Sequence, residues 1–269
     1  MPRVKSKRRQ QLEHMVMVPV DWLDERGPVL VTGVRYFLFR RVPHDSNWFH
    51  TLGSATLTAF IVQVVTGVIL AMYYKPTPEE AYGSIQNITN DLTLGWLVRG
   101  MHRWGASVFI ILLFLHLGRV FLFGAYKYPR ELNWLVGVLL LVLAMLEGFT
   151  GYLLPWDQTA YWATVVGINL NATAPIAGPF IADFLRGGAE IGENTLSIFY
   201  SFHMLLIPGG LIALITLHLY LVVHLGITSP PWSKDAPGLE REEVVTARRG
   251  LVDPRPRGDG AAFTPNRKT

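Results

Sequence analysis

Four histidines lie within long apolar stretches of the chain, at matched intervals. His102 and His116 are 14 residues apart, and His203 and His218 are 15 apart. At about 100° per residue, 14 helical steps return to within about 40° of the starting direction, and 15 steps to within about 60°. Each helix is therefore expected to present both of its histidines on roughly one face, about 21 to 23 Å apart along the axis.

Imidazoles in this arrangement are suited to axial ligation of haem iron. The iron takes two axial ligands from opposite faces of the macrocycle, and facing helices of a bundle commonly supply them. Two helices with matched pairs thus predict two bis-histidine haems, one near each membrane surface. A hydrogen-bonded packing histidine is the ordinary alternative for any single one of them. One shared metal ion is disfavoured, because the two levels lie roughly 21 Å apart.

The apolar stretches are long enough to span a membrane. Half of the 269 residues are hydrophobic and 16% are charged, and a spanning helix needs about 20 mostly apolar residues. Four segments qualify: residues 51–74, 97–123, 134–154 and 195–226. The predicted fold is an all-α integral membrane protein, a di-haem bundle of four transmembrane helices. An interfacial helix is expected around Trp22 in the N-terminal segment, and the long loop at residues 155–194 is expected to form short helices across the bundle end.

The charge distribution predicts the topology. Nine Lys or Arg residues precede the first span and eight follow the last, while residues 157–193 carry only Arg186 against four carboxylates. By the positive-inside rule, both termini and the loop between the second and third spans are cytoplasmic, in a multi-pass protein of the cell membrane. The net charge of +4 is therefore assigned to topology, and no nucleic acid is expected as a partner.

Topology and composition set the predicted pairing and domains. The second and fourth spans both run from the outer side inward, which pairs His102 with His203 and His116 with His218. Residues 1–46 are expected to be a cytoplasmic segment with the amphipathic helix, 47–231 the haem domain, and 232–269 an extended or disordered cytoplasmic tail. The sequence has no cysteine, which excludes haem attachment through thioether bonds.

Glycines and arginines accompany the histidines. Two glycine pairs repeat the 14-residue interval, where a missing side chain lets a flat macrocycle approach the backbone; close helix packing is the alternative. These are Gly53 with Gly67 and Gly137 with Gly151. Four arginines are predicted to pair with haem propionates, with snorkelling to the membrane interface as the alternative. They are Arg99, Arg103, Arg119 and Arg130.

Several stretches resemble a known family. DWLDER, GWLVRGMHRWGAS, LHLGRVF, PRELNW, TGYLLPWDQTAYWA and HLGITSPP are similar to cytochrome b6 and the N-terminal half of cytochrome b, across about residues 20–231. The resemblance implies a subunit of a dimeric quinol:cytochrome c (or other carrier) oxidoreductase, working with a Rieske iron-sulphur protein and a cytochrome c-type subunit. It also implies that His102 and His203 hold the low-potential haem on the outer side. His116 and His218 would hold the high-potential haem, which passes electrons to quinone on the cytoplasmic side.

Departures from the family pattern matter as well. The Pro-Glu-Trp-Tyr motif, whose glutamate takes a proton from quinol, is absent, so a separate chain resembling subunit IV is expected. Thr51 stands where chains of the b6 type have the cysteine that attaches an extra c-type haem, and Val223 replaces a usual arginine. No covalent third haem is expected, and a non-covalent one stays open.

Further site residues have two interpretations each. The quinol-oxidation surface is expected to involve Gly148, Tyr152 and Trp156. Glu147, inside the third span, is expected either to line a proton exit path or to hydrogen-bond across the bundle. His224 is either a proton donor to quinone or a solvated helix-end residue. The alternative functions are a di-haem membrane anchor for a quinone-linked dehydrogenase or hydrogenase, and a purely structural membrane bundle.

Overall fold

The computed structural model describes residues 22, 25–27 and 47–228, and all regular structure in this part of the chain is helical. The predicted interfacial helix lies mostly outside the described residues, as do the predicted domains 1–46 and 232–269. The elements follow in the order η1 (Trp48–Thr51), α3 (Leu52–Ala71), α4 (Ala81–Asn90), α5 (Gly95–Leu122), α6 (Glu131–Leu153), α7 (Gln158–Ala172), α8 (Gly178–Arg186), α9 (Glu193–Ser201), η2 (Phe202–Leu206) and α10 (Ile207–Leu225).

Four helical stretches of the described chain are long and apolar enough to cross a membrane: Trp48–Ala71, Gly95–Leu122, Glu131–Leu153 and Glu193–Leu225. The predicted all-α fold with four spans is therefore confirmed, and each predicted boundary lies within three residues of the observed one. The first span was predicted to run to residue 74 but ends at Ala71. Beyond Ala71 the chain turns, and Tyr74 becomes buried against the end of the bundle.

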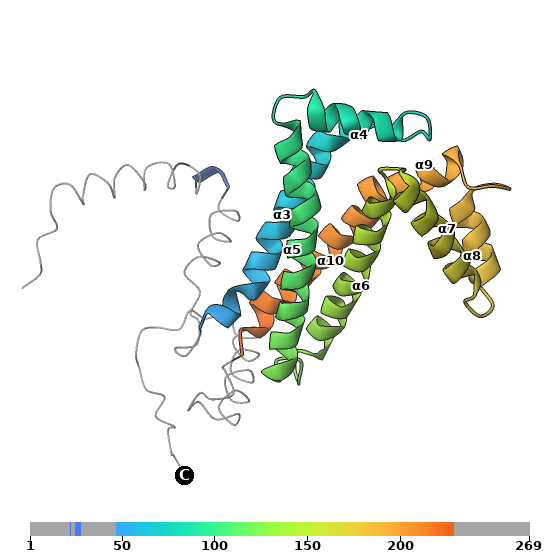
Figure 1. Cartoon of the computed structure of the whole chain (residues 1–269). Coiled ribbons are helices and arrows are strands. Elements are labelled where there is room, and N and C mark those ends of the chain that lie inside the picture. The colour runs from blue at the N-terminus through green and yellow to red at the C-terminus, as the bar shows by residue number, and fades with distance from the viewer. Residues whose placement is uncertain (1–21, 23–24, 28–46, 229–269) are drawn as a thin grey trace, which may run out of the picture.

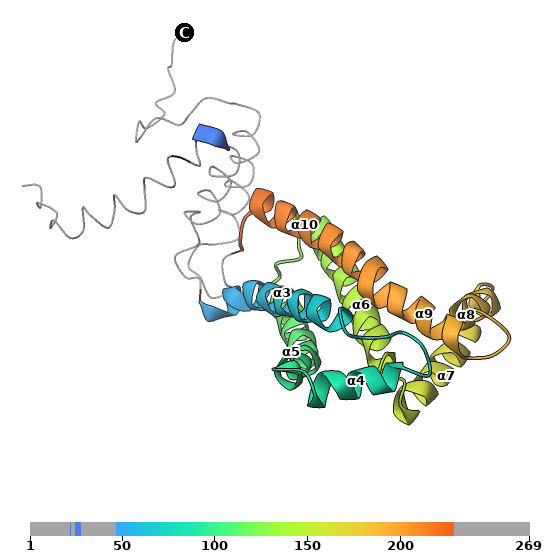
Figure 2. The same cartoon turned by 90° about the horizontal axis from the view of Figure 1, so that it is seen from above.

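The four spans form two pairs, α3 with α5 and α6 with α10, which are visible in both views (Figures 1 and 2). An apolar cluster at mid-height joins the pairs. It consists of Phe60, Phe109, Val136, Leu140, Ala144, Ile207 and Leu211. Most large side chains on the outer surface of the spans are apolar and exposed, as expected for helices that face lipid rather than water. The bundle therefore has an apolar centre as well as an apolar exterior.

Polar contacts join the two pairs at each end of the bundle. At one end, the hydroxyl of Tyr74 donates to the carbonyl oxygen of Leu154, 2.6 Å away. At the other end, Nε2 of His50 lies 3.3 Å from the carbonyl oxygen of Thr228. These contacts connect the first span to the third and to the last.

Helix α4 lies between the first two spans, where the sequence analysis predicted no helix. It lies across the end of α5 and reaches toward α6 and α9 (Figure 1). Its buried Ala81 and Ile88 pack with Tyr74 and Leu196. A β-carbon at Gly95 would clash with the carbonyl of Ile88, so α5 can begin beneath α4 only with glycine there.

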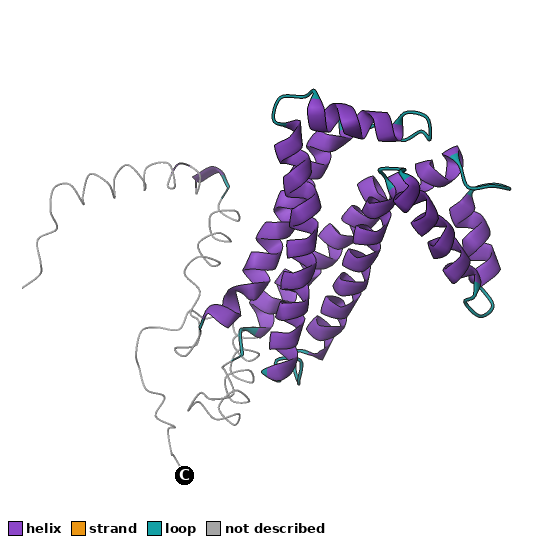
Figure 3. Ribbon diagram, viewed as in Figure 1, coloured by secondary structure: helices purple, strands orange, loops and turns teal. Residues whose placement is uncertain are grey.

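Helices α7 and α8 occupy the loop that was expected to be long and partly helical (Figure 3). They lie side by side in both views and extend sideways from the end of α6 and α9 (Figures 1 and 2). The prediction that they cross the bundle end was wrong, because α4 already covers that end. Their packing uses Leu153, Ile168, Ala182 and Phe199, which form a separate apolar cluster.

The Tyr74 hydrogen bond allows a test of the packing at this end. Burial raises the pKa of Tyr74, so its phenol stays a neutral donor. We expect Tyr74→Phe to lower the free energy of unfolding by about 1–3 kcal/mol, because the carbonyl of Leu154 loses its partner. Thermal denaturation of the purified complex measures this. Tyr73→Phe is the control, since Tyr73 is exposed; equal stability of both variants would contradict the assignment.

Candidate haem sites

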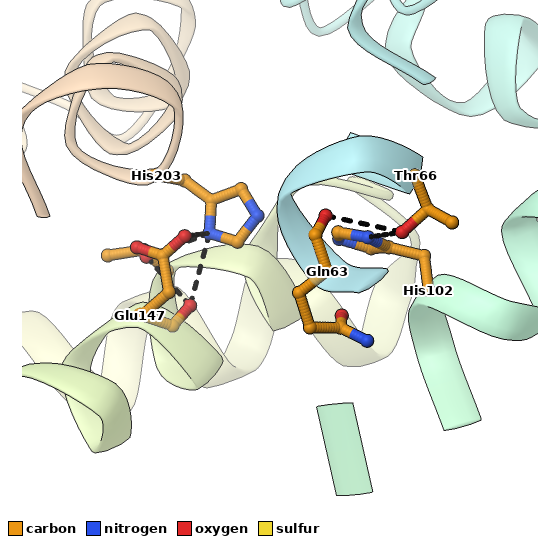
Figure 4. Close-up of polar contacts among 6 residues, drawn as sticks. Gln63, Thr66, His102, Glu147 and His203 are labelled. Atoms are coloured by element: carbon orange, nitrogen blue, oxygen red, sulfur yellow. Dashed lines mark hydrogen bonds and ion pairs between the residues drawn. The ribbon is translucent and has the colours of Figure 1, made fainter. Parts of the chain in front are cut away.

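Two pairs of histidine rings face each other between the helix pairs. The ring centres of His102 and His203 are 6.2 Å apart with an interplanar angle of 87°. Those of His116 and His218 are 6.4 Å apart at 83°. Figure 4 shows the rings of His102 and His203 extending toward one another from α5 and η2. The structure thus brings together the same two pairs that the topology predicted.

The ring separations fit one metal ion between each pair. A metal–imidazole bond of about 2.0–2.1 Å, plus about 1.1 Å from the nitrogen to the ring centre, places each ring centre about 3.2 Å from the ion. Two imidazoles on opposite sides of one ion would have centres about 6.3 Å apart. The observed 6.2 and 6.4 Å agree with that value, so the histidines present fit the haem iron that their spacing predicts.

Hydrogen bonds orient the rings at the level of His102 and His203. Nδ1 of His102 lies 2.9 Å from the hydroxyl of Thr66. Nδ1 of His203 lies 3.1 Å from the carbonyl oxygen of Glu147 and 3.3 Å from the hydroxyl of Thr150. With Nδ1 occupied, Nε2 is left for a metal, which is the usual arrangement of ligating histidines.

The two threonines were missed by sequence reasoning, although a signal for them was present. Thr66 directly precedes Gly67, and Thr150 directly precedes Gly151. The other two glycines of the 14-residue pattern follow apolar residues, Leu52 and Val136. A threonine directly before a histidine-facing glycine therefore distinguishes the level of His102 and His203 from that of His116 and His218.

Each predicted glycine lies against one histidine ring on the neighbouring helix. A β-carbon at Gly53 would lie 3.1 Å from Cε1 of His116, and one at Gly67 would lie 3.2 Å from Cε1 of His102. At Gly151 the ring of His203 is closer still, whereas at Gly137 the gap to His218 is an ordinary 3.7 Å. The sequence prediction assigned these glycines to clearance for the macrocycle. In the structure they make room for the imidazoles.

The unequal histidine intervals are explained by a π-helical turn. His203 lies in η2, the π-helical segment Phe202–Leu206, within the otherwise α-helical fourth span. A π-turn accommodates one extra residue without breaking the helix. Pro208 favours it, because proline lacks an N–H and its ring crowds the carbonyl four residues earlier. The 15-residue interval therefore presents both histidines to α5, much as 14 residues do in a regular helix.

The predicted arginines separate into two groups. Arg119 lies close to His116 and Arg130, and its Nε and Nη2 are buried without a hydrogen-bond partner in the described part of the chain. Buried guanidinium donors of this kind suit an anion such as a haem propionate. Arg130 donates to the carbonyl of Leu225, 3.4 Å away.

The arginines at the other level point elsewhere. Arg99 donates to the hydroxyl of Thr89 on α4, 3.2 Å away. Arg103 is exposed and has no hydrogen bond or ion pair within residues 47–228 or the few described residues before them. Arg119 is therefore the strongest of the four predicted propionate partners.

The remaining predicted site residues lie at the two ends of the bundle. Gly148 and Tyr152 are exposed on α6, and Trp156 is half-buried in the turn that follows. Trp156 has a φ of 53°, a left-handed conformation that is unusual outside glycine. His224 is exposed at the end of α10, with its ring 4.0 Å from that of Tyr220.

The glycine contacts predict a graded response to alanine. We expect Gly151→Ala to weaken haem binding at the level of His102 and His203 by about 5- to 150-fold, the equivalent of about 1–3 kcal/mol of overpacking. Gly137→Ala is expected to retain both haems, because its β-carbon has normal space. Gly148→Ala, on the same helix with open space around it, is the control. Haem content per purified chain measures the effect, and equal losses from all three variants would contradict it.

The π-turn predicts that one residue can be removed from the fourth span. Deleting Leu205 is expected to convert η2 to regular helix and to leave both histidines facing α5, so both haems are retained. Deleting Ile110 from α5 is the matched comparison, because it rotates His116 by about 100° relative to His102. Reduced-minus-oxidised spectra report the haems. If the Leu205 deletion loses as much haem as the Ile110 deletion, the explanation is refuted.

Comparisons with known proteins agree with this geometry. A family profile described as Cytochrome b/b6/petB matches residues 39–226. The chain is 43% identical to cytochrome b6 of Heliobacterium modesticaldum over 212 residues, which cover 78% of this chain and 100% of that one. It is 42% identical to cytochrome b6 of Mastigocladus laminosus, over 78% of this chain and 97% of that one.

A solved structure is similar as well. It is described as a hyperthermophilic respiratory Complex III, with a TM-score of 0.70 and 30% identity. The match covers 87% of this chain and 65% of that one, so the chain spans just under two thirds of that relative. With four membrane-spanning helices, two facing histidine pairs and a profile match over most of its length, the chain belongs to the cytochrome b family.

Proposed function

We propose that the chain holds two haems b and carries electrons across the membrane within a quinol-oxidising complex of the bc or b6f type. Electrons would pass from a quinol-oxidation site on the outer side to a quinone-reduction site on the cytoplasmic side. The observation that carries this proposal is the pair of facing histidine couples, with ring centres 6.2 and 6.4 Å apart, in a bundle of the cytochrome b family.

The residues of the chain hold and separate the cofactors. When bound, each haem supplies a one-electron redox centre. His102 and His203 ligate one iron, His116 and His218 the other, and Arg119 neutralises a propionate. Along α5 the two levels are about 21 Å apart, and the apolar cluster around Phe60 and Phe109 lies between them. In this proposal, one redox centre lies near each face of the membrane.

The orientation follows from charge. Lys127 and Arg130 lie in and beside the connection between α5 and α6, at the bundle end nearest His116 and His218. By the positive-inside rule we assign this end to the cytoplasm. His102 and His203 then lie on the outer side of the cell membrane, together with α4, α7 and α8. Gly148, Tyr152 and Trp156 are assigned to the quinol site at this end.

The chain is proposed to work with other subunits. It covers the full length of cytochrome b6 of Heliobacterium modesticaldum but 65% of the cytochrome chain in the respiratory Complex III. The sequence contains no Pro-Glu-Trp-Tyr motif, and we propose that a subunit IV-like chain supplies its glutamate. A Rieske protein and a cytochrome c-type subunit are proposed to complete a dimeric complex. A covalent haem c is not expected, because the sequence has no cysteine.

Removal of single ligands tests the proposal. We expect His102→Leu and His116→Leu each to abolish one of two b-type haems in the purified complex and to stop quinol oxidation. His224→Leu, which removes an exposed histidine from the fourth span, is the control and should keep both. Reduced-minus-oxidised spectra measure the haems. A wild-type complex without b-type absorbance would favour a structural bundle, and co-purification with a molybdenum or nickel subunit would favour a dehydrogenase or hydrogenase anchor.

A further inference from the structure

Glu147 is a carboxylate placed inside a membrane span, beside a histidine proposed to bind iron. Its Oε1 lies 3.1 Å from Nδ1 of His203, and the contact is drawn in Figure 4. The other carboxylate oxygen, Oε2, is buried and has no hydrogen-bond partner among the described residues. The carboxylates Glu131 and Glu193 instead stand at the first residues of their spans. Glu147 is thus held by its contact with the histidine and not by a pairing cation.

The two haem levels differ at this position. Glu147 precedes Gly151 by four residues, and Asn133 precedes Gly137 by four. The same register of α6 therefore places a carboxylate near His203 but an amide-bearing residue near His218. Nδ1 of His218 lies beside the backbone of Asn133 without a hydrogen bond of ordinary geometry. Within the described chain, His203 is the one of the four paired histidines with a carboxylate at Nδ1.

A carboxylate in this place acts on the metal through the ring. Nδ1 of His203 faces three oxygens: Oε1 of Glu147, the backbone carbonyl oxygen of Glu147 at 3.1 Å and the hydroxyl of Thr150 at 3.3 Å. To the extent that the carboxylate attracts the Nδ1 proton, it makes Nε2 a stronger electron donor. In its ionised form the carboxylate also favours the ferric over the ferrous iron, and the effect is large where water is excluded. Hydrogen bonding around axial ligands is one of the means by which proteins set haem potentials.

We propose that Glu147 is a positioning residue that lowers the midpoint potential of the haem held by His102 and His203. The inference rests on the proposed function, since it requires that these histidines ligate haem. Its consequence is a larger potential difference between the two haem levels. Electrons would then be driven from the Glu147 level to the level of His116 and His218.

Potentiometry of the intact complex tests the inference. Glu147→Gln keeps the size of the side chain and an acceptor oxygen but cannot be ionised. We expect it to shift the ferrous-to-ferric ratio of one haem at least tenfold toward ferrous, about 59 mV upward for a one-electron couple. The second haem should keep its potential. Glu131→Gln removes a carboxylate from the same helix, far from His203, and should move neither potential.

The outcomes are distinguishable from a failure of the proposed function. If the wild-type complex lacks two b-type haems, the proposed function fails before the variant is made. If Glu147→Gln holds both haems at wild-type potentials, the inference alone is overturned. Should the Gln variant lose haem, Glu147→Asp is the second variant. Its side chain is one methylene shorter, so the carboxylate lies farther from His203. We expect it to raise the same midpoint potential by less than the shift predicted for Glu147→Gln. A wild-type potential in that variant likewise overturns the inference.

Discussion

The contact between a histidine ring and the bare backbone of a facing glycine determines how the spans pack. It occurs at both levels of both helix pairs, with Gly53 and Gly67 on α3 and Gly137 and Gly151 on α6. Because a β-carbon at most of these positions would crowd the ring, glycine lets the helices within a pair approach closely where the histidines lie. The two imidazoles of each level are thereby directed across the bundle, toward each other.

This contact explains why the central features could be predicted from the sequence. The four spans are separate apolar blocks, and the histidines and glycines repeat at helical intervals along them. Both signals lie in short stretches of sequence, so they can be recognised without knowledge of the tertiary structure. The partners of each ring follow from the topology, because spans two and four run in the same direction. The pairing of His102 with His203 therefore required no more than spacing and charge.

Features that depend on tertiary packing were not predictable in the same way. Helix α4 is short and carries few apolar residues, and its burial depends on Tyr74 and Leu196 from distant segments. The direction of Arg99 depends on Thr89 of that unpredicted helix. Similarly, the π-helical turn at His203 became recognisable only when the backbone showed where the fifteenth residue was absorbed. Pro208 was the one local sign of it.

The π-turn also bears on how the length of this helix can change. An insertion in a membrane helix normally rotates and shifts everything beyond it, but here the additional residue is confined to Phe202–Leu206. Segments on either side keep their orientation toward α5. Sequences with 14- and 15-residue intervals are thus geometrically equivalent, and an alignment between them should place its gap within these five residues and not in the neighbouring loops. Gain or loss of that residue is then expected to leave the facing of the histidine pairs unchanged.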